Sequence, residues 1–217
     1  FRTLPETACL LLVEIQGDTA EIMAQKEKKI REAIVSISTI QPYKFTSDPK
    51  EYNFNWKARK GLLSTIGGLR KTGTTCLIED VAFPISRLGE ACVALKELFK
   101  KYEYADAVLY GHALDGNFHI VFSQDFNTPS EVQRYADMMD DLADIVVNRF
   151  DGSLKAEHGT GRNMAPFVEK EWGEEAYKIM KKIKQIFDPN YLIKPRVLIN
   201  ENPKIHLENL KPLPDAI

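Results

Sequence analysis

Short apolar runs alternate with amphipathic stretches along the chain, a pattern that predicts a mixture of strands and helices. Strands are expected where a short apolar or β-branched run ends at a turn residue, namely at 8–16, 43–46 and 76–83. Helices are expected after capping sequences or a proline, namely at 18–36, 48–64, 84–102 and 128–150, with Asp18 and Asp48 as the caps of the first two. A Gly- and Thr-rich loop is expected at 66–75.

Two further features complete the expected fold. Asp115-Gly116 is a strong turn signal within an apparent hairpin at 107–123. Near the end of the chain, one helical stripe is apolar and consists of Ile179, Met180, Ile183, Ile186 and Phe187. We therefore expect an α+β domain at 1–199, a ferredoxin-like helix-backed antiparallel sheet with a C-terminal helical segment. The polar, proline-rich residues 200–217 are expected to form a linker towards a following domain.

Composition and charge narrow the classes of function. The 29 basic and 31 acidic residues are scattered and give a net charge of −2, which offers no field for binding nucleic acid. No apolar run approaches the ~20 residues that cross a bilayer, so no membrane span is expected. The 3 cysteines have no CxxC spacing, so they supply no iron–sulfur cluster and indicate free thiols in a reducing compartment such as the cytoplasm.

The expected hairpin aligns two histidines. If Asp115 and Gly116 form a two-residue loop, His112 and His119 are cross-strand partners with Cβ atoms roughly 5 Å apart. Two imidazoles at that separation can bind one metal ion. The opposite face then carries residues suited to a core, namely Leu109, Ala113, Phe118, Ile120 and Phe122. The alternative is an ordinary hairpin whose histidines are satisfied by local hydrogen bonds.

The loop Glu157-His158-Gly159-Thr160-Gly161 offers an acid and an imidazole on a backbone that glycines make pliable. A carboxylate beside two histidines leaves metal positions open for a substrate, so Glu157 is a candidate third ligand. His158 suits a general base, because the ordinary pKa of histidine lies near neutral pH. Alternatively, Glu157 simply favours the positive end of a following helix.

Arg59 is a candidate ligand for a substrate carboxylate. On the second expected helix it shares a face with Tyr52, Trp56 and Leu63, which predicts an inward, apolar stripe. A buried guanidinium needs an anionic partner, and its fork matches a carboxylate. The alternatives are a side chain that extends to the surface, or an ion pair with an acid such as Glu79.

Taken together, these motifs resemble the C-terminal domain of FAD-linked oxidases and dehydrogenases that share a vanillyl-alcohol-oxidase-type flavin domain. Gly-His-x-x-Asp-Gly-Asn-x-His stands at 111–119, Glu-His-Gly-x-Gly at 157–161, Ile-Lys-x-x-Phe-Asp-Pro at 183–189 and Trp-x-x-Arg at 56–59. The sequence Glu-Asp-Val-Ala-Phe-Pro at 79–84 and the polar tail at 200–214 make the chain look most like the large bacterial members of the family. Those carry a fused iron–sulfur domain and resemble D-lactate and D-2-hydroxyglutarate dehydrogenases.

The resemblance implies a flavin-dependent dehydrogenase that oxidises a D-2-hydroxy acid to the 2-oxo acid. It implies that His112, His119 and Glu157 bind a divalent metal, usually assigned as zinc, that His158 is the base, and that Arg59 holds the substrate carboxylate. FAD and an iron–sulfur cluster would belong to other domains of the parent chain, so this chain alone should be inactive. The parent is expected in the cytoplasm, or attached peripherally to the inner membrane.

Two departures from the family pattern affect these expectations. Val121 stands where asparagine is usual, which puts one polar substrate contact in doubt, and Lys194-Pro195-Arg196 replaces Asn-Pro-Gly. The residues alone also leave two other functions open. One is a metal-dependent hydrolase with the same ligands. The other is a non-catalytic ferredoxin-like binding module, for instance for RNA, which would need a basic, aromatic sheet surface that the chain lacks.

Overall fold

The computed structural model describes residue 5 and residues 8–210, and the chain divides into two compact units, Phe1–Leu62 and Leu63–Ile217. The helices α1 (Ala20–Ile34), α2 (Pro49–Lys60) and α3 (Leu62–Leu69) come first, and none of them contains a buried residue. The strands expected at 8–16 and 43–46 do not form. An apolar run becomes a strand only where a neighbouring strand takes its hydrogen bonds, and no described strand pairs with either run.

Capping side chains determine where the first helices begin. Thr19, rather than the expected Asp18, caps α1, because its hydroxyl accepts a backbone N–H of the first turn at 3.3 Å. Asp48 caps α2 as the sequence predicted, with its carboxylate accepting a first-turn N–H at 2.9 Å. The helical sequence continues to the end of α3, so the loop expected at 66–75 is shorter than predicted.

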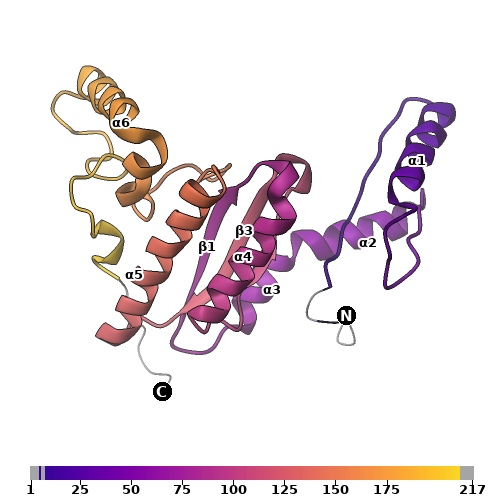
Figure 1. Ribbon diagram of the computed structural model, residues 1–217, viewed down its shortest axis with the longest axis horizontal. Coiled ribbons are helices and arrows are strands. Elements are labelled where there is room, and N and C mark those ends of the chain that lie inside the picture. Colours follow the sequence, from indigo (N-terminus) through magenta and orange to yellow (C-terminus); the bar gives the residue numbers. More distant parts are fainter. Residues whose placement is uncertain (1–4, 6–7, 211–217) are drawn as a thin grey trace. The chain divides into compact units, whose positions relative to one another are not determined.

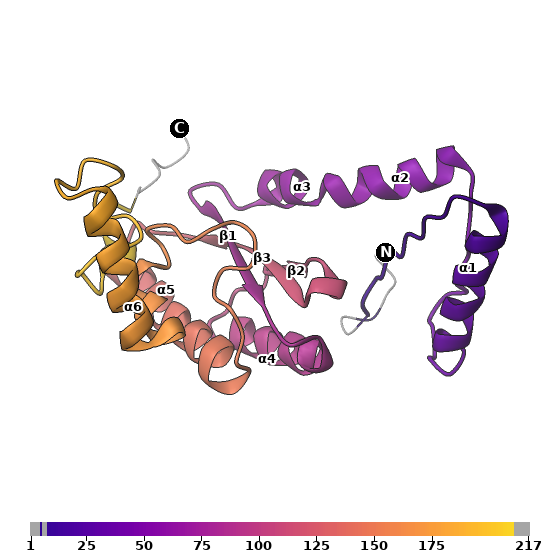
Figure 2. The same ribbon diagram turned by 90° about the horizontal axis from the view of Figure 1, so that it is seen from above.

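The second unit contains a three-stranded antiparallel sheet of β1 (Thr75–Ala82), β3 (Asn117–Gln124) and β2 (Val108–Tyr110), in that order. The connecting helix α4 (Leu88–Lys101) and the following helix α5 (Pro129–Asp144) lie on the same side of the sheet (Figures 1 and 2). Ser153 and Lys155 bridge to the free edge of β1, where a ferredoxin-like β-α-β-β-α-β unit has its fourth strand. The α+β fold class is confirmed.

Alternate residues of β3 divide between the hydrophobic core and the opposite face of the sheet. The core side consists of Phe118, Ile120 and Phe122, which pack against apolar residues of α4 and α5. Burial of such side chains contributes roughly 1.5–3 kcal/mol each. The opposite side consists of Asn117, His119 and Val121, which are also buried. The core therefore holds β3 rigid. The other face of this strand carries His119, one of the predicted site residues.

The loop between β2 and β3 is longer than the two residues expected, so the predicted register is wrong. The cross-strand partner of His119 is Tyr110, not His112. His112 instead precedes a single 3-10 turn, Ala113–Asp115, and the backbone N–H groups of Asp115 and Asn117 donate to the His112 carbonyl. These local hydrogen bonds replace the ladder pairs of a tighter hairpin. Gly116 closes the turn with a left-handed φ of 64°.

Gly116→Ala is expected to lower the free energy of unfolding more than Gly73→Ala. Both glycines have positive φ, +64° and +85°, where a Cβ costs about 1–2 kcal/mol. At Gly116 the new Cβ would also lie 2.0 Å from the carbonyl oxygen of Phe83, whereas nothing lies within 4 Å at Gly73. Chemical denaturation measures both losses. Equal losses would show that the close approach of this turn to Phe83, just after β1, has no energetic consequence.

The last long helix, α6 (Val168–Phe187), is amphipathic as predicted, but its apolar stripe is exposed. Gly173, with φ 79° and ψ 163°, interrupts the helix near its start. The side chains of Ile179, Ile183, Ile186 and Phe187 are 51% to 81% exposed, so this stripe does not join the core of the unit. Neither α6 nor any other described helix is long and apolar enough to cross a membrane.

Residues 200–210, which the sequence places in a linker, belong to the second unit and pack against earlier residues of it. They include a single 3-10 turn in which His206 is buried beside the rings of Tyr135 and Phe167. Residues 211–217 lie outside the described residues. The domain boundary expected after residue 199 stays a prediction.

Candidate functional site

Three side chains that the sequence singled out lie together in the second unit. Oε1 of Glu157 is 3.3 Å from Nε2 of His112 and 3.1 Å from Nε2 of His119. The two imidazole rings are 5.4 Å apart between centres and nearly perpendicular, at 89°. Two nitrogens and a carboxylate oxygen therefore converge, although the histidines are not cross-strand partners.

His119 is the most enclosed member of this cluster. Its Nε2 faces Glu157, while its Nδ1 lies 3.3 Å from Oδ1 of Asp80 without a hydrogen bond among the described residues. Burial, together with His158 and His112, lowers the pKa of His119 by more than the nearby carboxylates Asp80 and Glu157 raise it. The neutral imidazole, which is the form that binds metals, is therefore favoured.

Asp80 holds the loop that carries Glu157 and His158, and reasoning from the sequence did not single it out. Its Oδ2 accepts the backbone N–H groups of both loop residues at 2.7 Å, and its Oδ1 accepts the side-chain amide of Asn117 at 2.7 Å. Burial raises the pKa of Asp80, but these donors and His158 outweigh burial and lower it below its ordinary value. The feature of the sequence that could have identified Asp80 is an acidic residue within an apolar strand, because a buried charge needs partners.

His158 lies on the same loop, next to the cluster. Its ring stacks flat on that of His119, with centres 4.8 Å apart and an interplanar angle of 3°. Its Nδ1 is 3.9 Å from Oδ2 of Asp80, and 40% of the side chain is exposed. A partly exposed imidazole beside the convergent ligands can reach a molecule bound there, as a general base must.

The donor set fits a divalent metal such as zinc. Imidazole nitrogens and carboxylate oxygens are ordinary zinc ligands at about 2.0–2.2 Å. Asp80 is a second nearby carboxylate, since one ligand atom each of Asp80, His119, Glu157 and His158 lies within 4.8 Å of the others. Both oxygens of Asp80 already accept hydrogen bonds, so it is better suited to supporting the ligands from behind than to binding the metal itself. The ligand roles of His112, His119 and Glu157 stay predictions.

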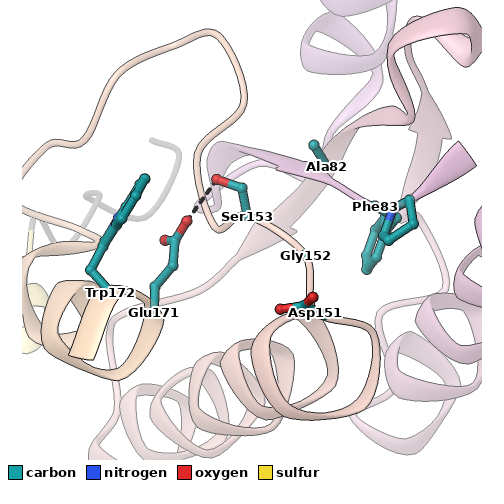
Figure 3. A pocket seen from close by; sticks show the side chains of 8 residues that line it. Ala82, Phe83, Asp151, Gly152, Ser153, Glu171 and Trp172 are labelled. Carbon is teal, nitrogen blue, oxygen red and sulfur yellow. Dashed lines mark hydrogen bonds between the residues drawn. The ribbon is translucent and has the colours of Figure 1, made fainter.

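A cavity of about 390 Å³ opens beside the cluster, and its lining includes His112, Asn117 and Glu157. A second cavity of about 350 Å³ shares Ala82 and Ser153 with the first (Figure 3). The first cavity has room for a small hydroxy acid, and its walls supply both imidazole and carboxylate groups.

Arg59 lies in the first unit, whereas the other predicted site residues lie in the second. Its helix α2 has no buried residue, and Tyr52 on the same face is exposed, so the expected core-facing stripe is wrong for the described residues. Glu79, an alternative partner considered for Arg59, accepts a hydrogen bond from Lys155 at 2.8 Å. The role of Arg59 as a carboxylate ligand stays a prediction.

Val121 and residues 194–196 depart from the family pattern, and the structure shows the surroundings of Val121 and the backbone conformation of Arg196. Val121 is fully buried on the same face of β3 as His119, where an asparagine would need a hydrogen-bonding partner. Arg196 has a φ of 59°, a left-handed conformation that the glycine usual at this position adopts more readily. The structure does not explain why an arginine stands there.

Residues 2–198 match the family described as FAD linked oxidases, C-terminal domain. The chain belongs to this family. It is 31% identical over 190 residues to the mitochondrial D-lactate dehydrogenase [cytochrome] of Arabidopsis thaliana, covering 87% of this chain and 32% of the relative. It is 27% identical over 192 residues to glycolate oxidase subunit GlcD of Bacillus subtilis, covering 88% and 40%.

A third relative is the D-2-hydroxyglutarate dehydrogenase of Xanthomonas citri pv. viticola, 28% identical over 141 residues, which are 64% of this chain and 29% of the relative. The chain therefore spans between 29% and 40% of the length of these relatives. More than half of each relative has no counterpart here.

Proposed function

We propose that this domain forms the metal- and proton-binding part of a FAD-dependent dehydrogenase that oxidises a D-2-hydroxy acid to the 2-oxo acid. The observation that carries the proposal is the convergence of His112, His119 and Glu157, with His158 stacked beside them. The names of the relatives support the substrate class, which would be of the lactate or 2-hydroxyglutarate type.

The residues of this chain would divide binding from proton transfer. Arg59 would bind the substrate carboxylate with two parallel hydrogen bonds and so orient C2. His158 would accept the proton of the 2-hydroxyl group. Loss of that proton, together with the C2 hydrogen and its electron pair, converts the C2–OH group into the carbonyl of the product.

A divalent metal held by His112, His119 and Glu157, which we propose to be zinc, would supply Lewis acidity that lowers the pKa of the substrate hydroxyl. Asp80 would keep Nε2 of His119 directed at Glu157 and away from β1, since Nδ1 is the nitrogen that faces Asp80. This arrangement makes the ligand geometry depend on β1 as well as on the hairpin.

The hydride that leaves C2 needs an acceptor, which is the chemistry that FAD would supply, and a domain outside this chain would mainly bind it. We further propose that the parent protein includes an iron–sulfur domain, and that residues 1–199 form the domain while 200–217 lead towards the next one. The parent would lie in the cytoplasm, or bind peripherally to the inner membrane. Its partner at this site would be a small hydroxy acid and not a nucleic acid.

Chelation of the metal is expected to abolish oxidation of D-2-hydroxy acids by the flavin-containing parent protein, and added Zn²⁺ should restore it. Glu157→Gln removes one of three ligands, so metal content and activity should fall together, whereas Glu174→Gln on the exposed side of α6 should change neither. Metal analysis and flavin reduction measure both. Full activity without metal would disprove the metal assignment, and a metal-loaded protein that no 2-hydroxy acid reduces would disprove the dehydrogenase assignment.

A further inference from the structure

Glu79 is a buried carboxylate for which the proposed chemistry has no use. It pairs across the sheet with Ile120 and therefore lies on the core side of β1, whereas Asp80 lies on the other side. Only 1% of it is exposed. Burial raises its pKa, an effect that Lys155 and Asn163 offset only in part. Because removal of a carboxylate from water is costly, its presence in the core calls for a physical reason.

The two oxygens of Glu79 bind residues on either side of the site loop. Oε2 accepts a hydrogen bond from Nζ of Lys155 at 2.8 Å, and Oε1 accepts one from the side-chain amide of Asn163. These partners lie two residues before and five residues after the Glu157-His158 pair. The hydroxyl of Tyr135 on α5 donates to Oδ1 of Asn163 at 2.7 Å, which determines the direction in which the amide points.

The adjacent acids of β1 thus hold the loop at different points. Asp80 binds its backbone in the middle, and Glu79 binds side chains at its entry and exit. Ser153, just before the loop, donates to Glu171 of α6 at 2.7 Å (Figure 3). By contrast, the side chains of Glu157 and His158 are 53% and 40% exposed. Surrounding residues therefore enclose these two side chains only in part, whereas the loop that carries them is held at its ends and in its middle.

We propose that Glu79 is a positioning residue, which places Glu157 and His158 by fixing both ends of their loop. The proposal rests on the function proposed above for those two side chains. An apolar pair of similar volume often stabilises a protein as well as a buried ion pair does. What the ion pair and the amide contact add is direction, because each hydrogen bond fixes an angle as well as a distance.

The double variant Glu79→Leu/Lys155→Met, made in the flavin-containing parent protein, separates positioning from stability. The apolar pair should offset loss of the ion pair, so the free energy of unfolding should fall only by the cost of the Asn163 amide, which loses its acceptor. We expect kcat to fall about 10–100-fold, as for other residues that orient site ligands, with KM nearly unchanged because Arg59 lies outside the loop. Hydrogen exchange should accelerate in peptides that cover 156–164 and stay unchanged in α4.

A matched control and a conservative variant complete the test. Asp141→Asn removes a carboxylate that binds Lys101 and Tyr102 between α4 and α5, and it should change neither kcat nor loop exchange. Wild-type kcat and loop exchange in the folded double variant would overturn the proposal. If the double variant does not fold, Glu79→Gln tests the proposal by the same two measurements. We then expect a lower kcat and faster hydrogen exchange in the loop.

The same measurements distinguish failure of the positioning role from failure of the proposed function. If Glu157→Gln keeps full activity and metal while the double variant still shows faster loop exchange, Glu79 positions a loop whose proposed chemistry is wrong. If Glu157→Gln loses metal and activity but the double variant behaves as wild type, only the positioning role fails.

Discussion

Asp80→Ala is expected to lower the free energy of unfolding and to release the loop that carries Glu157 and His158. The substitution removes the acceptor of two backbone N–H groups and of the Asn117 amide. A buried donor without a partner costs about 1–3 kcal/mol, so a total loss of roughly 3 kcal/mol or more is expected. Chemical denaturation measures the loss, and oxidation of a 2-hydroxy acid by the parent protein should disappear with it.

Two other substitutions test the origin of that loss. Asp80→Asn preserves shape and one oxygen, so it should destabilise less than Asp80→Ala. Asp106→Ala removes an exposed carboxylate from the loop before β2 and should change stability little. A midpoint of unfolding for Asp80→Ala equal to that of the wild type would mean that the loop is held by other contacts.

The lowered pKa of Asp80 also gives this stabilisation a pH dependence of known sign. The folded protein releases the Asp80 proton at lower pH than the unfolded chain, whose pKa is about 3.9. The stabilisation is therefore present above that value and is lost as pH falls through the folded pKa. The difference in stability between the wild type and Asp80→Asn should accordingly shrink as the solution is made more acidic.

The clustering of His112, His119 and Glu157 could be anticipated from the sequence, but the geometry of the hairpin could not. Asp115-Gly116 does mark a turn, and Gly116 does have the left-handed conformation. The error concerns loop length, because hydrogen bonds to the His112 carbonyl favour a 3-10 turn over two more ladder pairs. Such competition between local and cross-strand hydrogen bonds involves small energies that turn sequences alone do not reveal.

The two acids of β1 show a different limit of sequence reasoning. Residues 76–83 have the composition of a buried strand, which suggests that any acid within it has a partner. The loop partners of Glu79 and Asp80 lie more than 70 residues further along the chain, at a segment that bridges to the edge of β1. Only the fold brings them together, so the supporting part of the site was missed.

Apolar periodicity also fails to show what covers an apolar face. The stripe of α6 and the run at 8–16 have apolar patterns, yet Ile186, Phe187 and Leu10 are at least 75% exposed. Burial against any apolar partner is favourable for a hydrophobic side chain, whether that partner lies in the same unit or elsewhere. Periodicity therefore predicted the type of the helix correctly but does not show whether its apolar face is covered.

His158→Ala is expected to lower kcat roughly 10²–10⁴-fold in the parent protein, the usual contribution of a positioned base. KM should change little, because the carboxylate of the substrate would be bound by Arg59. Arg59→Ala should show the opposite behaviour, because it removes a charged two-pronged contact. It should chiefly raise KM, and the fall in kcat/KM should correspond to a loss of a few kcal/mol of transition-state binding. Steady-state kinetics with one 2-hydroxy acid compares the two variants directly.

A loss of activity in His158→Ala has two physical explanations, because the ring of His158 also stacks on that of His119. Loss of proton transfer predicts wild-type metal content, wild-type hydrogen exchange in the loop, and partial recovery of kcat when imidazole is added to the buffer. Disturbance of the metal ligands predicts reduced metal content and no recovery with imidazole. A variant with normal metal content and unchanged kcat would remove the proton-accepting role from His158, while the His112, His119 and Glu157 cluster would keep its proposed role in binding metal.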